Sequence, residues 1–209
     1  MRDRAEDQII LALIRHGETE ANVKRRYLGK TDEPLSARGR QLLLSYKERH
    51  FYPRATYLFA SPMRRCMETA EILYPMQNPV IISEWEETDF GSFEYKNYEE
   101  LKDDPFYRQW MESGGTMAFP GGESRETFVN RCVTGFQNMC RMLRKAQADN
   151  PSGNGTEPVR AAAIVHGGTI MALLSFYGEK AYFDYQTANG RGYLCRITCQ
   201  NGIKDIVKL

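Results

Sequence analysis

The sequence predicts an α/β fold, a three-layer α/β/α sandwich around a mostly parallel central sheet. Short apolar runs of strand length, such as Ile9–Ile14, lack polar alternation and are typical of strands buried on both faces. Segments with helical periodicity alternate with these runs, and that alternation is the pattern of layered α/β proteins. No repeat or linker divides the 209 residues, so we expect a single domain over 1–209.

Apolar periods and terminal residues predict the individual elements. The predicted strands are 9–14, 57–60, 79–82, 160–165, 192–198 and 203–207. The predicted helices are 36–50, 61–73, 124–148 and 169–177. Ser36 is a suitable N-cap, and Ser61 with Pro62 has the pattern of an N-cap and a first helical residue. The stretch 84–122 is irregular and rich in aromatic and acidic residues, and 150–158 is a polar loop.

Composition limits the partners and the location of the protein. With 28 basic and 27 acidic residues, the net charge is +1, which argues against nucleic acid or a membrane surface as the main partner. The apolar run at 9–14 is too short for a signal peptide or a membrane span. The cysteines lack CxxC spacing and are odd in number, so we expect reduced thiols in a cytoplasmic protein. They are Cys66, Cys132, Cys140, Cys195 and Cys199.

The three histidines of the chain differ in their setting. His16 and His166 each follow a predicted buried strand and each precede a glycine, whereas His50 ends a polar helix. Ligands of open parallel sheets bind at the carboxyl ends of the strands, so His16 and His166 are predicted to meet at a ligand site. The alternative for either histidine alone is a hydrogen-bonded structural role. His50 is predicted to be solvated.

Two arginines are candidates for binding an anion. Arg15 ends a buried strand, where a guanidinium is costly unless it meets an anion, and its planar fork suits phosphate. Of the neighbouring pair that follows Ser61, Arg64 has Glu68 four residues later and is expected to face solvent. Arg65 shares its helix face with Thr69, so we expect it to point inward.

The residues Leu13 to Asn22, LIRHGETEAN, resemble the opening motif of the histidine phosphatase superfamily, which includes the cofactor-dependent phosphoglycerate mutases. Further segments resemble later motifs of the family in the same order: 29–36, 61–70, 87–91, 121–124 and 165–169. The resemblance covers most of the chain. It implies the phosphoglycerate mutase-like form of the α/β/α fold, and it also selects Arg65 as the second arginine.

The resemblance implies a role for each candidate residue. His16 would attack phosphorus as a neutral imidazole and form a phosphohistidine; an ordinary pKa of about 6.5 and nearby arginines favour that form. Glu87, rather than Glu84 or Glu86, would be the general acid, because Phe90 and Gly91 anchor the alignment. The phosphoryl group would be held by Arg15, Arg65, His166 and Asn22, with backbone approach at Gly17 and Gly167.

The chemistry is expected to need no metal and no cofactor. The sequence contains no P-loop pattern and no acidic metal cluster. Two arginines and a cationic His166 could neutralise the phosphate charge that a metal would otherwise neutralise. The expected partner is a small phosphorylated metabolite.

Three functions remain open: a phosphatase, a phosphoglycerate mutase, and an inactive module that binds a phosphorylated ligand. Mutases of the family carry a longer insertion after the acid and a C-terminal tail, while here 91–121 is modest and the chain stops soon after its last strand. We therefore favour a phosphatase, closest in pattern to bacterial α-ribazole phosphatase-like enzymes, with sugar phosphates also open. The presence of His16, Arg65, Glu87 and His166 argues against the inactive module.

The region 84–122 is expected to be a lid or insertion over the site. Four of its residues either line a substrate pocket or form the core of the lid: Phe106, Tyr107, Trp110 and Met111.

Overall fold

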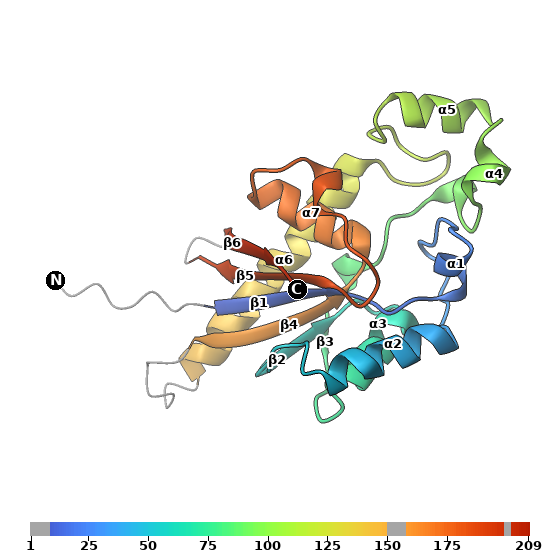
Figure 1. Cartoon of the computed structure of the whole chain (residues 1–209). Helices are drawn as coiled ribbons and strands as arrows, with labels where there is room; N and C mark the ends of the chain where they lie inside the picture. The colour runs from blue at the N-terminus through green and yellow to red at the C-terminus, as the bar shows by residue number, and fades with distance from the viewer. Residues whose placement is uncertain (1–8, 150–157, 199–201) are drawn as a thin grey trace.

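A computed structural model describes residues 9–149, 158–198 and 202–209, and its centre is a six-stranded sheet (Figure 1). The predicted loop, apart from Pro158, and Cys199 lie outside these residues. The strands are β1 Ile9–Arg15, β2 Tyr57–Ala60, β3 Val80–Ile81, β4 Val159–Val165, β5 Gly192–Ile197 and β6 Ile203–Lys208. All six lie where the sequence predicts a strand, and β3 is the one that is clearly shorter.

The sheet is mixed, with the strand order β3-β2-β4-β1-β5-β6. The pairs β2–β3, β2–β4 and β1–β4 are parallel, whereas β1–β5 and β5–β6 are antiparallel. Only β5 therefore runs against the others, which confirms a mostly parallel sheet. The continuous apolar runs predict this arrangement, because β1 and β4 are central strands that are covered on both faces.

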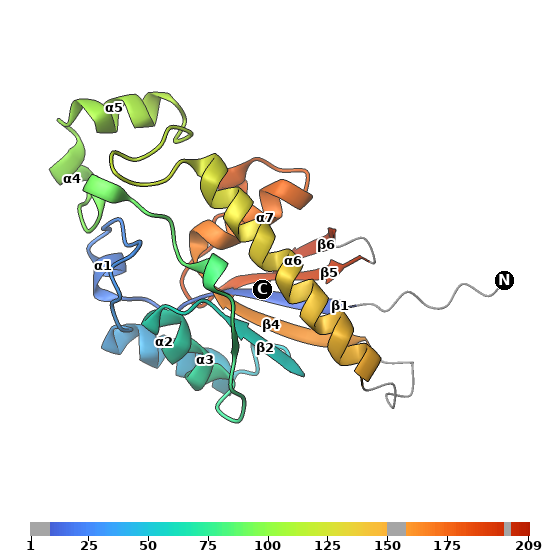
Figure 2. The same cartoon turned by 180° about the vertical axis from the view of Figure 1, so that it is seen from behind.

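Helices cover both faces of the sheet (Figures 1 and 2). On one face, Leu11 and Leu13 of β1 pack into a core with α6 and α7; on the other, Ala12 and Ile14 pack with α2 and α3. The α-helices are α1 Glu20–Val23, α2 Ala37–Glu48, α3 Arg64–Leu73, α4 Tyr98–Leu101, α5 Pro105–Glu112, α6 Arg125–Asp149 and α7 Gly167–Tyr177. This alternation along β1 produces the predicted three layers. In the described part of the chain, no helix has the length and apolar character to span a bilayer.

The beginnings of the two helices predicted from serine caps differ. Ser36 caps α2 as predicted, because its Oγ accepts a hydrogen bond from the Gly39 N–H at 2.9 Å. Helix α3 begins at Arg64 with Met63 as its N-cap, so the predicted start at Ser61 is wrong. The hydroxyl of Ser61 instead binds a residue that is distant in the sequence, as described below.

The region 84–122 lies beyond the carboxyl ends of the parallel strands and includes α4 and α5 (Figure 1). It has an apolar cluster of its own, formed by Phe93, Leu101, Tyr107 and Phe119. The sequence leaves undecided whether Phe106, Tyr107, Trp110 and Met111 line a pocket or form the core of this region. Tyr107 is in this core, while Phe106 is 61% exposed. Trp110 packs against the cluster and also lines a cavity. The exposed fraction of Met111 is 52%.

Candidate active site

His16 and His166 lie side by side at the carboxyl ends of two neighbouring strands. Arg15 at the end of β1 pairs in parallel register with Val165 at the end of β4, so the next residue of each strand is a histidine. Their rings meet edge to face with centroids 5.2 Å apart. The strand-end argument from the sequence predicts this meeting. His50, in contrast, is exposed just after the end of α2, as predicted.

The environment of His16 selects one neutral form of its imidazole. Its Nδ1 is 2.7 Å from the carbonyl oxygen of Gly17, and since a carbonyl only accepts, Nδ1 carries the proton. Burial holds the pKa of His16 well below its ordinary value, and the charges of Arg65 and Arg15 lower it further. Nε2 therefore has a free lone pair, which is the state required of a nucleophile.

His166 is also neutral, and both of its nitrogens have partners. Arg65 Nε donates to Nδ1 at 3.3 Å, so Nε2 carries the proton and donates to Ser61 Oγ at 2.8 Å. Burial and then the charge of Arg65 hold the pKa of His166 well below its ordinary value. This corrects the expectation of a cationic His166: the positive charge of the site comes from the arginines.

Arg65 points inward and Arg64 outward, as the sequence predicts. The Arg65 side chain is fully buried, and it donates to the carbonyl oxygens of Gly29 at 2.9 Å and Thr31 at 3.0 Å. Arg64 instead pairs with Glu68 at 2.9 Å on the surface. The loop 29–31 thereby holds the guanidinium of Arg65 next to both histidines.

Arg15 contributes a second, partly buried guanidinium with unused donor capacity. Its Nη1 donates to the carbonyl oxygen of Thr187 at 2.7 Å, while its buried Nε has no hydrogen-bond partner among the described residues. Burial lowers the pKa of Arg15, the charge of Arg65 adds to that effect, and Glu87 opposes it. Two neighbouring cations, Arg65 buried and Arg15 partly buried, and an unpaired N–H are the features of a site that binds an anion.

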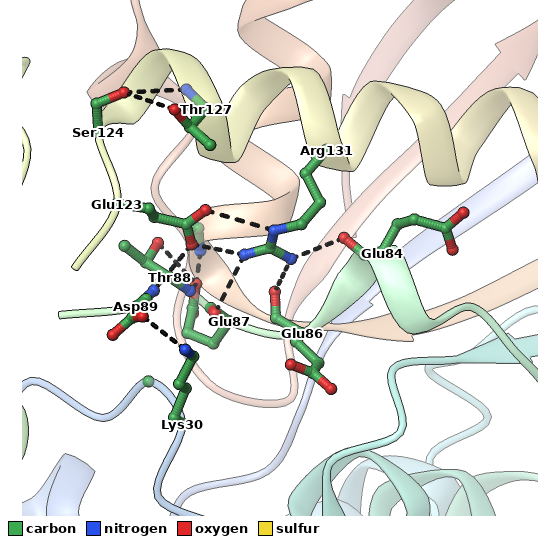
Figure 3. A network of polar contacts seen from close by, with 12 residues as sticks. Lys30, Glu84, Glu86, Glu87, Thr88, Asp89, Glu123, Ser124, Thr127 and Arg131 are labelled. Carbon is green, nitrogen blue, oxygen red and sulfur yellow. Dashed lines mark hydrogen bonds and ion pairs between the residues drawn. The ribbon is translucent and has the colours of Figure 1, made fainter. Parts of the chain in front are cut away.

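The Glu87 carboxylate reaches the first turn of α7, directly after His166. Its Oε2 accepts from the Gly168 N–H at 3.4 Å and its Oε1 from the Thr88 N–H at 2.9 Å. A Cβ at position 168 would lie 2.3 Å from Glu87 Oε1, so only glycine permits this approach. Figure 3 shows that the segment carrying Glu87 is bound through its backbone to Arg131 of α6.

Asn22 and the glycines of the two histidine motifs have different environments. Asn22 Oδ1 accepts from the Thr19 N–H at 3.2 Å and from Asn189 Nδ2 at 3.0 Å, which orients the amide nitrogen of Asn22 as a donor. The Gly17 N–H donates to Thr69 Oγ1 at 3.0 Å. This N–H therefore has a partner within the protein, and the backbone approach to a phosphate expected around Gly17 stays a prediction. Gly167 begins α7, and a Cβ there would lie 3.3 Å from Arg15 Nε.

Three residues of the site were not among the sequence candidates: Ser61, Arg131 and Asn189. Ser61 follows β2, and His166 follows the neighbouring strand β4, but the sequence around Ser61 resembles a helix cap. Asn189 Nδ2 contacts the carbonyl oxygens of His16 at 3.1 Å and Gly17 at 3.4 Å from a loop without any recognisable motif. Of these three residues, only Ser61 has a sequence feature that indicates the site, because it directly follows a predicted strand.

A cavity of about 310 Å³ adjoins Glu87 and Gly168. Its walls are mainly aromatic and come both from 84–122 and from α6 and other segments outside that region: Tyr27, Phe90, Trp110, Phe119, Phe128, Tyr182 and Phe183. Among the described residues that line it, Arg125 is the one cation, and its guanidinium lies 4.7 Å from the ring centroid of Tyr182. The buried Trp110 Nε1 has no hydrogen-bond partner among the described residues. The cavity suits a flat, largely apolar group with few polar atoms.

No group of three or more metal-binding side chains comes together within the ranges that the structure describes.

Known proteins resemble this chain in sequence. The sequence profile of the histidine phosphatase superfamily (branch 1) matches residues 11–208. A protein of Salmonella paratyphi C (strain RKS4594) named "Probable phosphoglycerate mutase GpmB" is 32% identical over 123 residues, which cover 57% of this chain and 57% of that protein. The matched part thus spans less than two thirds of the relative's length.

Solved structures resemble the chain over nearly its whole length. The α-ribazole phosphatase from Shigella flexneri has a TM-score of 0.77 at 22% identity and covers 96% of each chain; at this identity the likeness shows the fold. The phosphoglycerate mutase from Thermus thermophilus has a TM-score of 0.64 at 27% identity, covering 97% of this chain and 99% of that one. The similar proteins thus carry the names of two activities.

Proposed function

Since the chain belongs to the histidine phosphatase superfamily (branch 1), we propose that it is a phosphatase that hydrolyses a small phosphate monoester through a phosphohistidine on His16. The observation that carries the proposal is the tautomer of His16. Its Nδ1–H is held by the Gly17 carbonyl, so Nε2 presents a lone pair beside His166, Arg15 and Arg65.

The first step transfers the phosphoryl group to the enzyme. His16 Nε2 forms a bond to phosphorus while the bond from phosphorus to the ester oxygen breaks, and the leaving oxygen takes a proton from Glu87. Arg15 and Arg65 stabilise the charge on the phosphoryl oxygens, and the oriented amide of Asn22 adds a neutral donor. His166 accepts from Arg65 Nε and so fixes the plane of that guanidinium.

The second step restores the enzyme. Water attacks phosphorus, Glu87 as a carboxylate accepts a proton from that water, and the bond between His16 Nε2 and phosphorus breaks. Phosphate leaves, and Glu87 is again protonated for the next cycle. A covalent intermediate divides one difficult displacement into two easier ones.

The substrate is proposed to be a small metabolite whose alcohol carries a flat or apolar group. The cavity next to Glu87 supports this class, because its walls are aromatic and Arg125 is the single cation among the described residues that line it. An α-ribazole phosphate, which ends in a planar base, fits that lining, and a sugar phosphate is the second candidate. The region 84–122 is proposed as the lid that completes the cavity.

A phosphoglycerate mutase is the alternative function, and the names of two similar proteins favour it. Phosphoglycerate carries a carboxylate next to its phosphate, so its pocket needs further cations close to the transferred group. The lining of the cavity is poor in such groups, which supports the phosphatase. An inactive binding module is disfavoured because His16, Arg15, Arg65, Glu87 and His166 converge.

Phosphate release from a panel of monoesters tests the proposal. The panel contains α-ribazole phosphate, sugar phosphates, glycerol phosphate and 4-nitrophenyl phosphate, each with a chelator and with His16→Ala in parallel. The proposal expects release by the wild type and almost none by His16→Ala. No release from any ester would refute the phosphatase, and interconversion of 2- and 3-phosphoglycerate that depends on a bisphosphate primer would establish the mutase.

A further inference from the structure

Arg131, in the second turn of α6, binds three backbone carbonyl groups of the segment that carries Glu87. Its Nη1 donates to the carbonyl oxygens of Glu84 at 2.8 Å and Glu86 at 2.9 Å, and its Nη2 lies 3.4 Å from that of Glu87 (Figure 3). These carbonyls lie at and just before Glu87 in the chain. The contacts are therefore with the main chain of the segment and do not involve the Glu87 carboxylate, which faces Gly168.

Glu123 extends the same network to the residues after Glu87. Its carboxylate pairs with Arg131 Nη2 at 2.6 Å and also accepts from the Asp89 N–H at 2.8 Å. The pair is largely shielded from solvent, since the side chain of Arg131 is 28% exposed and that of Glu123 is 12% exposed. The backbone is thus held on both sides of Glu87, before it by Arg131 and after it by Glu123.

The network requires the shape of a guanidinium as well as its charge. One planar group with separate N–H donors serves a carboxylate and three carbonyls together, which a lysine ammonium on a flexible stem does not reproduce. One short 3-10 helix, Ser83–Trp85, precedes Glu87, and the residues from Glu86 to Phe90 form no helix or strand. The position of Glu87 therefore depends on tertiary contacts such as those of Arg131.

We propose that Arg131 is a positioning residue for the general acid: it holds the backbone at Glu87 so that the carboxyl reaches the leaving oxygen of the substrate. The inference rests on the proposed function, in which Glu87 protonates that oxygen. Proton transfer requires a donor within hydrogen-bond reach, and a misplacement of about 1 Å can cost about a hundredfold in rate.

Leaving-group dependence separates positioning from a general structural role. Glycerol phosphate has a poor leaving group that needs a proton, whereas 4-nitrophenolate leaves without one. The kcat/KM value reports the steps through phosphoryl transfer to His16, so it is measured for both esters with wild type, Glu87→Gln, Arg131→Gln, Arg131→Lys and a Glu87→Gln/Arg131→Gln double variant. Lys145→Gln, an exposed charge removal on the same helix, is the matched control.

Arg131→Gln is expected to lower kcat/KM for glycerol phosphate by about tenfold or more and that for 4-nitrophenyl phosphate by less than about threefold. Arg131→Lys is expected to fall between wild type and Arg131→Gln. In the double variant, loss of Arg131 should add almost nothing to loss of Glu87, because both act through the same proton transfer. Lys145→Gln should match wild type.

Equal losses on the two esters, or losses that multiply with those of Glu87→Gln, would overturn the inference and leave Arg131 a purely structural residue. If Arg131→Gln does not fold, Glu123→Gln weakens the same network with a smaller change and must show the same preference for the poor leaving group. The proposed function fails in a different way: wild type then releases no phosphate, or Glu87→Gln itself shows no leaving-group dependence.

Discussion

His16 and His166 share one buried environment in which both imidazoles are neutral. Their rings meet edge to face at 5.2 Å, and the guanidinium of Arg65 lowers the pKa of both. Each ring also has a fixed tautomer, because Gly17 accepts from one and Ser61 from the other. The pair therefore links the chemistry of the site to the stability of the fold.

We expect the free energy of unfolding to decrease as the pH falls below about 6.5, the ordinary pKa of histidine. In the unfolded chain both histidines take up a proton there, whereas in the folded chain their lowered pKa keeps them neutral. The unfolded state then binds more protons, so stability falls with pH by up to about 1.4 kcal/mol per pH unit for each histidine. The loss continues down to the pKa of the folded state and is measured by urea unfolding at pH 7.5, 6.5 and 5.5.

Two variants assign this pH dependence to the buried pair. His16→Gln should remove about half of the slope, and His50→Gln should leave it unchanged because His50 is exposed. A stability that does not change between pH 7.5 and 5.5, or a slope that disappears in His50→Gln, would contradict the buried neutral pair.

Ser61→Ala removes the acceptor of the His166 Nε2–H. Leaving a buried donor unsatisfied costs about 1–3 kcal/mol, so we expect unfolding to be easier by that amount and kcat/KM to fall as His166 loses its orientation. Ser175→Ala is the matched control: its hydroxyl donates to a carbonyl of its own helix α7, and its loss should cost less than about 0.5 kcal/mol. Equal stability of the two variants would refute a role for the Ser61 contact.

The strand-end histidines were predictable because burial of β1 and β4 is a local property of their sequences. The partners of those histidines were not. Ser61 lies 105 positions from His166 and Asn189 lies 167 positions from Asn22, and no spacing rule connects such pairs. The error at Ser61 has the same cause, since a serine before proline resembles a helix cap until its distant hydrogen-bond donor, His166, is known.

Other features of the site depend on surroundings that the sequence does not reveal. Both histidines are neutral mainly because they are buried, and the charges of nearby arginines lower their pKa further, so the expectation of a cationic His166 was incorrect. The partner of the Gly17 N–H is another such feature. The sequence predicts a backbone approach to phosphate in this region, and in the structure the Thr69 hydroxyl accepts from the Gly17 N–H.

Gly168→Ala and Gly167→Ala are expected to affect different steps of catalysis. A methyl group at 168 would lie 2.3 Å from Glu87 Oε1 and displace the acid, so kcat/KM should fall mainly for glycerol phosphate. A methyl group at 167 would lie 3.3 Å from Arg15 Nε and displace that side chain, so kcat/KM should fall for glycerol phosphate and 4-nitrophenyl phosphate alike. Identical leaving-group dependence in the two variants would argue against the separate roles of Glu87 and Arg15.

Phe183→Ala tests the aromatic cavity. Stacking of a base on an aromatic side chain is worth about 1–3 kcal/mol, so the KM for an α-ribazole phosphate should rise about fivefold or more. The KM for glycerol phosphate should not change, because it has no ring. Phe176→Ala is the control, since Phe176 is 53% exposed, as Phe183 is at 51%, but lies outside the cavity. An equal KM for α-ribazole phosphate in both variants would exclude stacking on Phe183.

The cavity walls and the proposed catalytic residues come from different parts of the chain, and this separation affects how the substrate selectivity of the enzyme can change. The proposed nucleophile and its arginines come from the sheet and α3, whereas several aromatic walls come from 84–122. A library randomised at Phe90, Trp110 and Phe119 would vary which alcohol is accepted while the phosphate chemistry stays intact. The fold therefore offers a fixed reaction with exchangeable selectivity, a favourable starting point for directed evolution toward new esters.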